Sequence, residues 1–133
     1  MAGKENKEKS RGSSLECCVA VVMTTFSREE DAENVATLLL SKSLASCIQM
    51  SNIKSLYKWK GRLEKGKEVL CIIKCLKDNI EGVVEEIKKN HTYEVPEIIV
   101  LEGRASKEYV DWMRRNDKKD KEGGGLVEAR FIN

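Results

Sequence analysis

Apolar and polar residues alternate along this chain in patterns that predict four strands. Residues 17–23 form a continuous run of small apolar side chains, which is typical of a strand covered on both faces. Residues 48–59 are extended and mostly alternating, and residues 69–76 are strongly apolar. Between these two strands, residues 61–66 begin and end with glycine and predict the turn of a hairpin. The apolar run 98–101 predicts the last strand.

Apolar positions with helical spacing predict two amphipathic helices between these strands. Each stripe follows the i, i+3, i+4, i+7 rule, the first through Ala32, Val35, Ala36 and Leu39 and the second through Ile80, Val83, Val84 and Ile87. The capping-box sequence Ser27-Arg28-Glu29-Glu30 is expected to open the first helix, and Asp78 to cap the second. Ser106 is expected to cap a short C-terminal helix that carries Tyr109, Trp112 and Met113.

This order, β-α-β-β-α-β plus a C-terminal helix, predicts an α+β ferredoxin-like sandwich. In that arrangement both helices cover one face of an antiparallel four-stranded sheet. The strand 69–76 does not alternate, because residues 69–73 are all apolar. Its second face must therefore be covered, and another copy of the chain is the simplest cover. The sequence thus predicts a homo-oligomer.

The two ends of the chain differ from its middle. Residues 1–15 are polar and charged, which predicts a disordered tail before one domain spanning residues 16–116. Residues 117–133 predict a second polar tail, whose last eight residues include apolar side chains that would allow a short docked strand. The first fourteen residues carry four basic and two acidic side chains and so account for the whole net charge of +2, which leaves the rest of the chain neutral. A neutral body argues against nucleic acid as a partner.

The cysteine pattern predicts a reducing compartment, and the lengths of the apolar runs predict no membrane span. The number of cysteines is odd, there is no CxxC motif, and the N-terminus has no apolar signal segment. We therefore expect reduced thiols and a cytoplasmic location. No apolar run approaches the ~18 residues that a membrane span requires, so no membrane partner is expected. Cys17, Cys18, Cys71 and Cys75 lie in apolar runs and are expected in the core.

Six short motifs in collinear order resemble one known family. They are Val21-Val22-Met23-Thr24-Thr25, Ala45-Ser46-Cys47-Ile48, Ser55-Leu56-Tyr57-Lys58-Trp59-Lys60-Gly61-Arg62-Leu63-Glu64, Glu68-Val69-Leu70 with Ile73-Lys74, His91-Thr92-Tyr93-Glu94-Val95-Pro96-Glu97-Ile98 and Tyr109-Val110-Asp111-Trp112. Over residues 16–116 the chain resembles the CutA family, the divalent cation tolerance proteins. The resemblance implies a ferredoxin-like fold, a homotrimer held by sheet edges, kinship with the PII signalling proteins, and a link to metal tolerance and copper binding. It implies no established reaction, so we expect a protein that is not an enzyme.

The resemblance also directs attention to a set of candidate metal ligands. Cys47, His91 and Glu97 are the residues expected to hold copper or another divalent cation, with no metal required for folding. Thr24 stands where copper-binding bacterial members have a cysteine, and Asn90 precedes His91 where they have two histidines. Cys47 is either a soft thiolate ligand or a small buried side chain. His91 is either a ligand or a residue that favours the C-terminal end of a helix dipole.

Other residues are candidates for a cleft or for a subunit interface. Lys74 lies in an apolar strand and needs water or a carboxylate, for which Glu97 is a plausible partner. Lys74, Glu97 and His91 then either converge on an inter-subunit cleft for a small anion or metal, or form a structural salt bridge. The aromatic residues expected to line a cleft or pack between subunits are Tyr57, Trp59, Tyr93 and Trp112. The leading hypothesis is a trimeric metal-response protein, and the alternative is a PII-like sensor or scaffold for an anion or small molecule.

Overall fold

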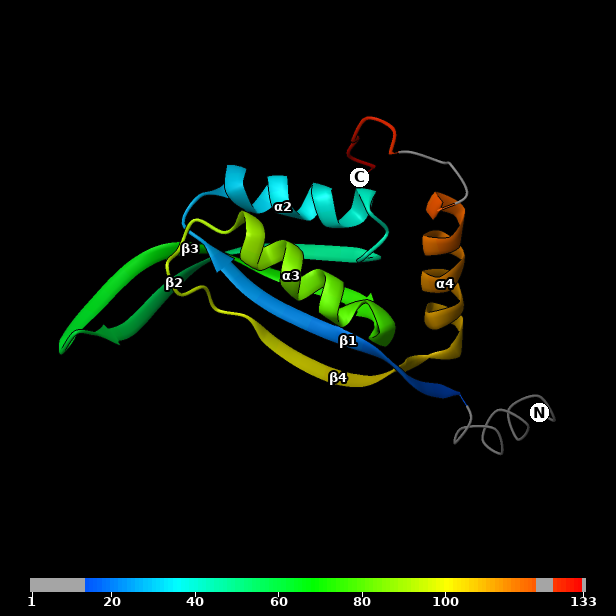
Figure 1. Cartoon of the computed structure of the whole chain (residues 1–133), viewed down its shortest axis with the longest axis horizontal. Coiled ribbons are helices and arrows are strands. Elements are labelled where there is room, and N and C mark those ends of the chain that lie inside the picture. Colours follow the sequence, from blue (N-terminus) through cyan, green and yellow to red (C-terminus); the bar gives the residue numbers. More distant parts are fainter. Residues whose placement is uncertain (1–13, 122–125, 133) are drawn as a thin grey trace.

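A computed structural model describes residues 14–121 and 126–132 and contains one mixed sheet-and-helix domain (Figure 1). The sheet has the strand order β2-β3-β1-β4, and every neighbouring pair is antiparallel. The predicted ferredoxin-like fold with an extra C-terminal helix is confirmed. The elements are β1 (Leu15–Phe26), α2 (Glu29–Ser41), β2 (Cys47–Trp59), β3 (Arg62–Leu76), the 3-10 turn η2 (Lys77–Asn79), α3 (Ile80–Asn90), β4 (Ile99–Ser106) and α4 (Lys107–Lys121).

The hydrophobic core lies between one face of the sheet and the helices α2 and α3 (Figure 1). Alternate residues of β1 and β3 point into it, as the two-residue period of a strand requires. Val22, Phe26 and Ile73 are at most 1% exposed. All four residues of the predicted α2 stripe are buried. In α3, Val83 and Ile87 are buried, while Ile80 packs at the edge of the same cluster.

The opposite face of the sheet is apolar but only partly covered within one chain. The pairing register places Val21 beside Leu101 and Met23 beside Ile99 on this face. The exposed fractions of Ile99 and Leu101 are 47% and 56%. Helix α4 lies at one end of the sheet, where it contacts β1, β3 and β4 (Figure 1). The predicted second apolar face is therefore present.

The hairpin between β2 and β3 is longer than the sequence suggests. We predicted its turn over residues 61–66, which is wrong: β2 ends at Trp59, β3 begins at Arg62, and Lys60-Gly61 alone form the turn. Both turn residues have positive φ, 50° for Lys60 and 79° for Gly61. A two-residue turn with two positive φ values matches the twist of a hairpin. Gly66 lies in the ladder opposite Ser55.

Of the three helix caps that the sequence predicts, one is confirmed. The Ser106 hydroxyl accepts a hydrogen bond from the backbone N–H of Tyr109, at 3.2 Å, and caps α4. The predicted capping box is wrong, because α2 begins after Arg28 and has no side-chain cap; the Arg28 guanidinium instead binds Asp31. The prediction that Asp78 caps α3 is also wrong. Asp78 lies inside η2, and the N-cap position of α3 is occupied by Asn79.

The domain limits in the structure differ from those predicted. Strand β1 already begins at Leu15, and α4 continues to Lys121, so residues 117–121 are helical where the sequence predicts a tail. Residues 126–132 form no strand, and Val127 and Phe131 are exposed. The rest of the two predicted tails, residues 1–13, 122–125 and 133, lies outside the described residues.

The five cysteines are free, and they divide by burial. Cys71 and Cys75 face α2 and α3 and are buried, as predicted. The same prediction is wrong for Cys17, which is exposed, and for Cys18, which is half-buried. Both lie at the start of β1, outside the core cluster that α2 and α3 cover. Burial raises the pKa of the Cys71 and Cys75 thiols to about 11.

We predict that Gly61→Ala destabilises the hairpin by about 1 kcal/mol, because an L-residue with a Cβ is strained at positive φ. Gly66→Ala is the matched control, since neither added Cβ has an atom within 4 Å and only Gly61 has positive φ. Amide hydrogen exchange of residues 55–66, together with denaturant unfolding, measures both variants. Equal protection in the two variants would show that backbone conformation at Gly61 does not limit the hairpin.

Candidate functional site

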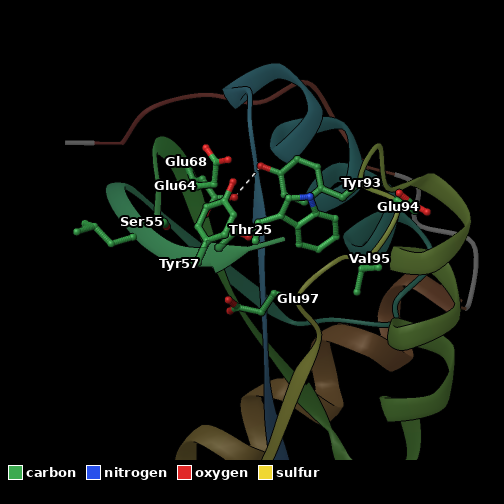
Figure 2. A pocket seen from close by; sticks show the side chains of 11 residues that line it. Thr25, Ser55, Tyr57, Glu64, Glu68, Tyr93, Glu94, Val95 and Glu97 are labelled. Atoms are coloured by element: carbon green, nitrogen blue, oxygen red, sulfur yellow. Dashed lines mark hydrogen bonds between the residues drawn. The ribbon is translucent and has the colours of Figure 1, made fainter. Parts of the chain in front are cut away.

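A cavity of about 650 Å³ lies between the β2–β3 hairpin, the end of β1 and the segment that joins α3 to β4 (Figure 2). Four glutamates and three aromatic residues dominate its lining. Among the described residues that line it, none is a lysine or an arginine. The four glutamates are Glu64, Glu68, Glu94 and Glu97, and the three aromatic residues are Tyr57, Trp59 and Tyr93. The cavity is therefore acidic and aromatic.

The hairpin register explains how the cavity acquires one of its walls. Tyr57 pairs with Glu64, and Ser55 with Gly66, so these residues share one face of the two-stranded ribbon. Because side chains alternate along a strand, Trp59 on β2 and Glu68 on β3 also lie on this face. The segment 93–97 supplies the facing wall, with Tyr93 and Glu97 directed toward the hairpin (Figure 2).

Glu68 lies at the centre of a hydrogen-bond network in this cavity. Burial raises the pKa of its carboxyl, but hydrogen bonds from the hydroxyls of Ser55, Tyr93 and Thr25 outweigh that effect and leave the pKa below its ordinary value. The hydroxyl of Tyr93 donates to the Glu68 carboxylate at 2.6 Å (Figure 2). Burial, followed by this carboxylate, raises the pKa of Tyr93. Glu68 is thus held ionised at neutral pH.

His91 positions Tyr93 and offers no free nitrogen to the cavity. Its Nδ1 accepts from the backbone N–H of Tyr93 at 3.1 Å, so Nε2 carries the proton and donates to the carbonyl of Thr25 at 2.7 Å. The ring stacks on Phe26, with centroids 4.3 Å apart. His91 is also the C-cap of α3, in line with the alternative of a helix-terminal residue. In this arrangement both nitrogens are engaged, and a metal would have to displace one bond.

Cys47 and Lys74 lie at the other end of the sheet. Cys47 pairs with Lys74, four residues along β3 from Leu70, which pairs with Thr25. At ~3.3 Å per residue, this separation is about 13 Å. The Lys74 ammonium lies 6.0 Å from the centre of the Tyr109 ring, and the Tyr109 hydroxyl hydrogen-bonds to Cys47.

The three predicted metal ligands are therefore not brought together within one chain. Glu97 lines the cavity, His91 lies behind it, and Cys47 is distant. Lys74 and Glu97 do not form an ion pair among the described residues. In residues 14–121 and 126–132, no three histidine, cysteine, aspartate or glutamate side chains are close enough to hold a metal ion. An arrangement between subunits stays a prediction.

The remaining candidates divide between the cavity and other parts of the fold. Tyr57, Trp59 and Tyr93 line the cavity, whereas Trp112 packs beside Tyr109 on α4, with ring centroids 5.4 Å apart. Thr24 is fully buried on the helix-facing side of β1, and its hydroxyl oxygen has no hydrogen-bond partner among the described atoms. That position therefore faces the core, while its neighbour Thr25 lines the cavity.

Sequence reasoning missed Glu64, Glu68 and Glu94. The signal was present for the two hairpin residues, because a turn at Lys60-Gly61 fixes the pairing of Tyr57 with Glu64. Placing the turn over residues 61–66 left Glu64 inside the turn and concealed that pairing. Glu94 has no such signal, since it lies in a segment without regular structure.

Comparison with known proteins matches this fold and these motifs to one family. A sequence model described as CutA1 divalent ion tolerance protein matches residues 20–116, which is most of the chain. The chain belongs to the CutA1 family. It is 36% identical over 100 residues to the divalent-cation tolerance protein CutA of Pyrococcus horikoshii, covering 74% of this chain and 98% of that relative.

Solved structures of other family members have the same fold. The periplasmic divalent cation tolerance protein CutA from Archaeoglobus fulgidus is similar with a TM-score of 0.72 and 32% identity, over 74% of this chain and 98% of that one. CutA1 from Oryza sativa is similar with a TM-score of 0.71 and 31% identity, over 74% and 93% of the two chains. The predicted CutA resemblance is thus confirmed. None of the helices within the described residues is long and apolar enough to cross a bilayer.

We predict that Tyr93→Phe lowers the stability of the protein by about 1 kcal/mol at pH 7, because Glu68 loses a hydrogen-bond donor. The pKa of Glu68 is lowered in the folded state. The carboxylate therefore stabilises the folded protein above its ordinary pKa of 4.5, and this stabilisation is lost as the pH falls through the lower folded-state pKa. The difference between wild type and variant should therefore shrink below pH 4.5. Thermal unfolding across pH measures it.

Tyr109→Phe is the matched control for this experiment. It also removes one phenol hydroxyl, but that hydroxyl contacts Cys47 and not a carboxylate. Its effect should not depend on pH between 3 and 7. A Tyr93→Phe loss that stays constant over the same range would contradict the assigned role of Glu68.

Proposed function

We propose that this protein is a non-enzymatic member of the divalent-cation response machinery and binds a hard divalent cation at the acidic cavity. The observation that carries the proposal is the lining of that cavity, which combines Glu64, Glu68, Glu94 and Glu97 with no described cationic side chain. Carboxylate oxygens are the ligands that Ca²⁺, Mg²⁺ and Mn²⁺ prefer. The relatives, which are named divalent-cation tolerance proteins, support this direction.

The charge of the cavity favours a cation over the alternative ligand. A PII-like sensor of an anion needs lysine, arginine or backbone N–H groups aimed at the ligand. Lys74, the strand lysine considered for that role, lies at the other end of the sheet beside Cys47. The ionised Glu68 in the wall of the cavity would repel an anion there. Copper also fits less well, because the soft ligand Cys47 is remote from the carboxylates.

Assembly is the second part of the proposal. We propose a homotrimer in which the apolar outer face of the sheet is covered by neighbouring subunits. Ile99 and Leu101 lie on that face beside Met23 and Val21, and together they form a continuous apolar surface. A surface of this kind is unfavourable in water and is typical of an interface. The free cysteines support the predicted cytoplasmic location.

Cation binding and assembly are expected to depend on each other. The four glutamates surround the cavity without converging on one point, and Glu94 lies on its far side from Glu64 (Figure 2). Within the described residues of one chain, they form no closed coordination shell. We therefore propose that a neighbouring subunit completes the site, and that the cation is bound tightly only in the trimer.

We predict that Mn²⁺ binds saturably to the wild-type protein, and that Glu64→Gln and Glu97→Gln each weaken it by about tenfold or more, which corresponds to ~1.4 kcal/mol. Titration calorimetry and the fluorescence of Trp59 in the cavity are the measurements. Glu33→Gln, an exposed charge change on α2, is the matched control and should bind normally. Saturable binding of inorganic phosphate without Mn²⁺ binding would favour the anion sensor instead.

We predict that Leu101→Lys breaks the assembly, because it places a charge on the apolar outer face. Light scattering should report about 45 kDa for the wild type, three times the 15.1 kDa chain, and a smaller particle for the variant. Thr37→Lys on the exposed side of α2 adds the same charge elsewhere and should leave the mass unchanged. A folded wild-type particle of 15.1 kDa would refute the trimer.

A further inference from the structure

The β2–β3 hairpin has two faces of different charge. Side chains alternate between the faces along each strand, and the pairing register sets which residues share a face. One face carries Tyr57 and Glu64 into the acidic cavity. The other face, called the lysine face below, consists of three cross-strand pairs, which are Lys54 with Lys67, Leu56 with Lys65, and Lys58 with Leu63.

The four lysines of this face have no acidic partner among the described residues. Each is exposed, and none forms an ion pair with another side chain in the part of the chain that the structure describes. Glu29, at the start of α2, lines the same hollow as Lys54 and Lys67 but forms no ion pair with either. Lys54 and Lys67 lie directly opposite each other, and like charges in such a pair destabilise a sheet. Folding of the hairpin therefore does not account for these charges.

Two exposed leucines lie among the lysines, close to the turn. The exposed fractions of Leu56 and Leu63 are 57% and 68%. They occupy diagonal positions in neighbouring cross-strand pairs, where long side chains are within reach of each other. Trp59, beside the turn on the other face, is 44% exposed. The end of the hairpin therefore combines exposed apolar side chains with lysines.

The hairpin holds this face away from the rest of the molecule. The ribbon projects beyond the helices and the other two strands, and α4 lies at the opposite end of the sheet (Figure 1). Along β3, the lysine face continues the alternate positions that face α2 and α3, such as Val69 and Cys71. The trimer proposed above covers the opposite set of positions. The lysine face would therefore stay accessible in that assembly.

This combination of charge and apolar exposure fits the surface of an anionic membrane. Lysines close to anionic headgroups each strengthen binding by about fivefold. Leucine side chains leave water when they enter the layer beneath the headgroups, and tryptophan is favoured at this boundary. Nucleic acid offers the negative charge without an apolar layer, so it would leave Leu56 and Leu63 in water. Contact with a membrane surface requires no spanning segment.

We propose that the lysine face docks on a membrane surface that contains anionic phospholipid. Leu56 and Leu63 enter the layer beneath the headgroups, and the four lysines lie against the phosphates. The sequence predicts no membrane partner because no apolar run can span a bilayer, and a surface contact does not need one. The proposal does not depend on the function proposed for the cavity, which lies on the other face of the hairpin.

Co-sedimentation with phosphatidylcholine vesicles, with and without phosphatidylserine, tests the charge requirement. Wild type should bind only the vesicles with phosphatidylserine, and more weakly as salt rises from about 0.1 M to about 0.5 M. The double variant Lys58→Gln/Lys65→Gln should bind about thirtyfold more weakly, because it loses two lysines near the surface. Lys88→Gln/Lys89→Gln, an equal change of charge at exposed positions of α3, should bind as wild type does. Absence of binding, or equal loss in the two double variants, would overturn the proposal.

The leucines distinguish a membrane from another polyanion. Leu56→Gln and Leu63→Gln should each weaken vesicle binding by about tenfold, because less apolar area leaves water. Val127→Gln changes an exposed apolar residue elsewhere and should have no effect. A single-stranded oligonucleotide is the competing probe. If it binds more tightly than the vesicles do, and the leucine variants bind both as wild type does, the lysine face is a nucleic-acid surface and the proposal is wrong.

Two further measurements separate this surface from the cavity and from folding. Vesicle binding should be unchanged in Glu97→Gln, and Mn²⁺ binding should be unchanged in Lys58→Gln/Lys65→Gln. Thermal unfolding and light scattering should show that each variant is folded and has the mass of wild type. Loss of vesicle binding in Glu97→Gln would place the lipid contact at the cavity and overturn the role of the lysine face.

Discussion

The architecture depends on a sheet that is apolar on both faces but is covered by helices on only one. Helices α2 and α3 enclose one set of alternate residues, which includes Val22 and Ile73. The other set, which includes Met23 and Leu101, is left half-buried or exposed within one chain. Burying apolar area is the dominant favourable contribution to folding and association, at roughly 25 cal/mol per Å². Self-association is the natural outcome of this constraint.

The β2–β3 hairpin connects the sheet to the candidate site. Beyond the pair Val69 and Phe26, the two strands continue without β1 as a free ribbon. One face of this ribbon carries Tyr57 and Glu64 into the cavity. The short turn at Lys60-Gly61 fixes the register, and a shift by one residue would move these side chains to the opposite face. The composition of the cavity is thus a consequence of turn geometry.

Neutral hydrogen-bond donors keep the Glu68 carboxyl of the cavity ionised. Hydroxyl donors around Glu68 compensate for its partial burial, and His91 fixes the backbone of Tyr93, which is one of those donors. This arrangement maintains negative charge where no described cationic side chain lines the cavity. At the start of β1, by contrast, the Arg114 guanidinium hydrogen-bonds to both the Glu16 carboxylate and the Cys18 sulfur.

The sequence by itself determined the order of the elements, both helix stripes, the two-sided apolar sheet and the family, because periodicity and collinear motifs are local properties. It also identified Tyr57, Trp59, Tyr93 and Glu97, which line the cavity. The hydrophobic pattern does not determine the hairpin register that adds Glu64 and Glu68, because it carries no information on the positive φ angles that place the turn at Lys60 and Gly61. Only the tertiary structure shows that Cys47 and His91 lie far apart. The two residues belong to different family motifs, and the distance between them depends on which strand residues pair, which the motifs do not specify.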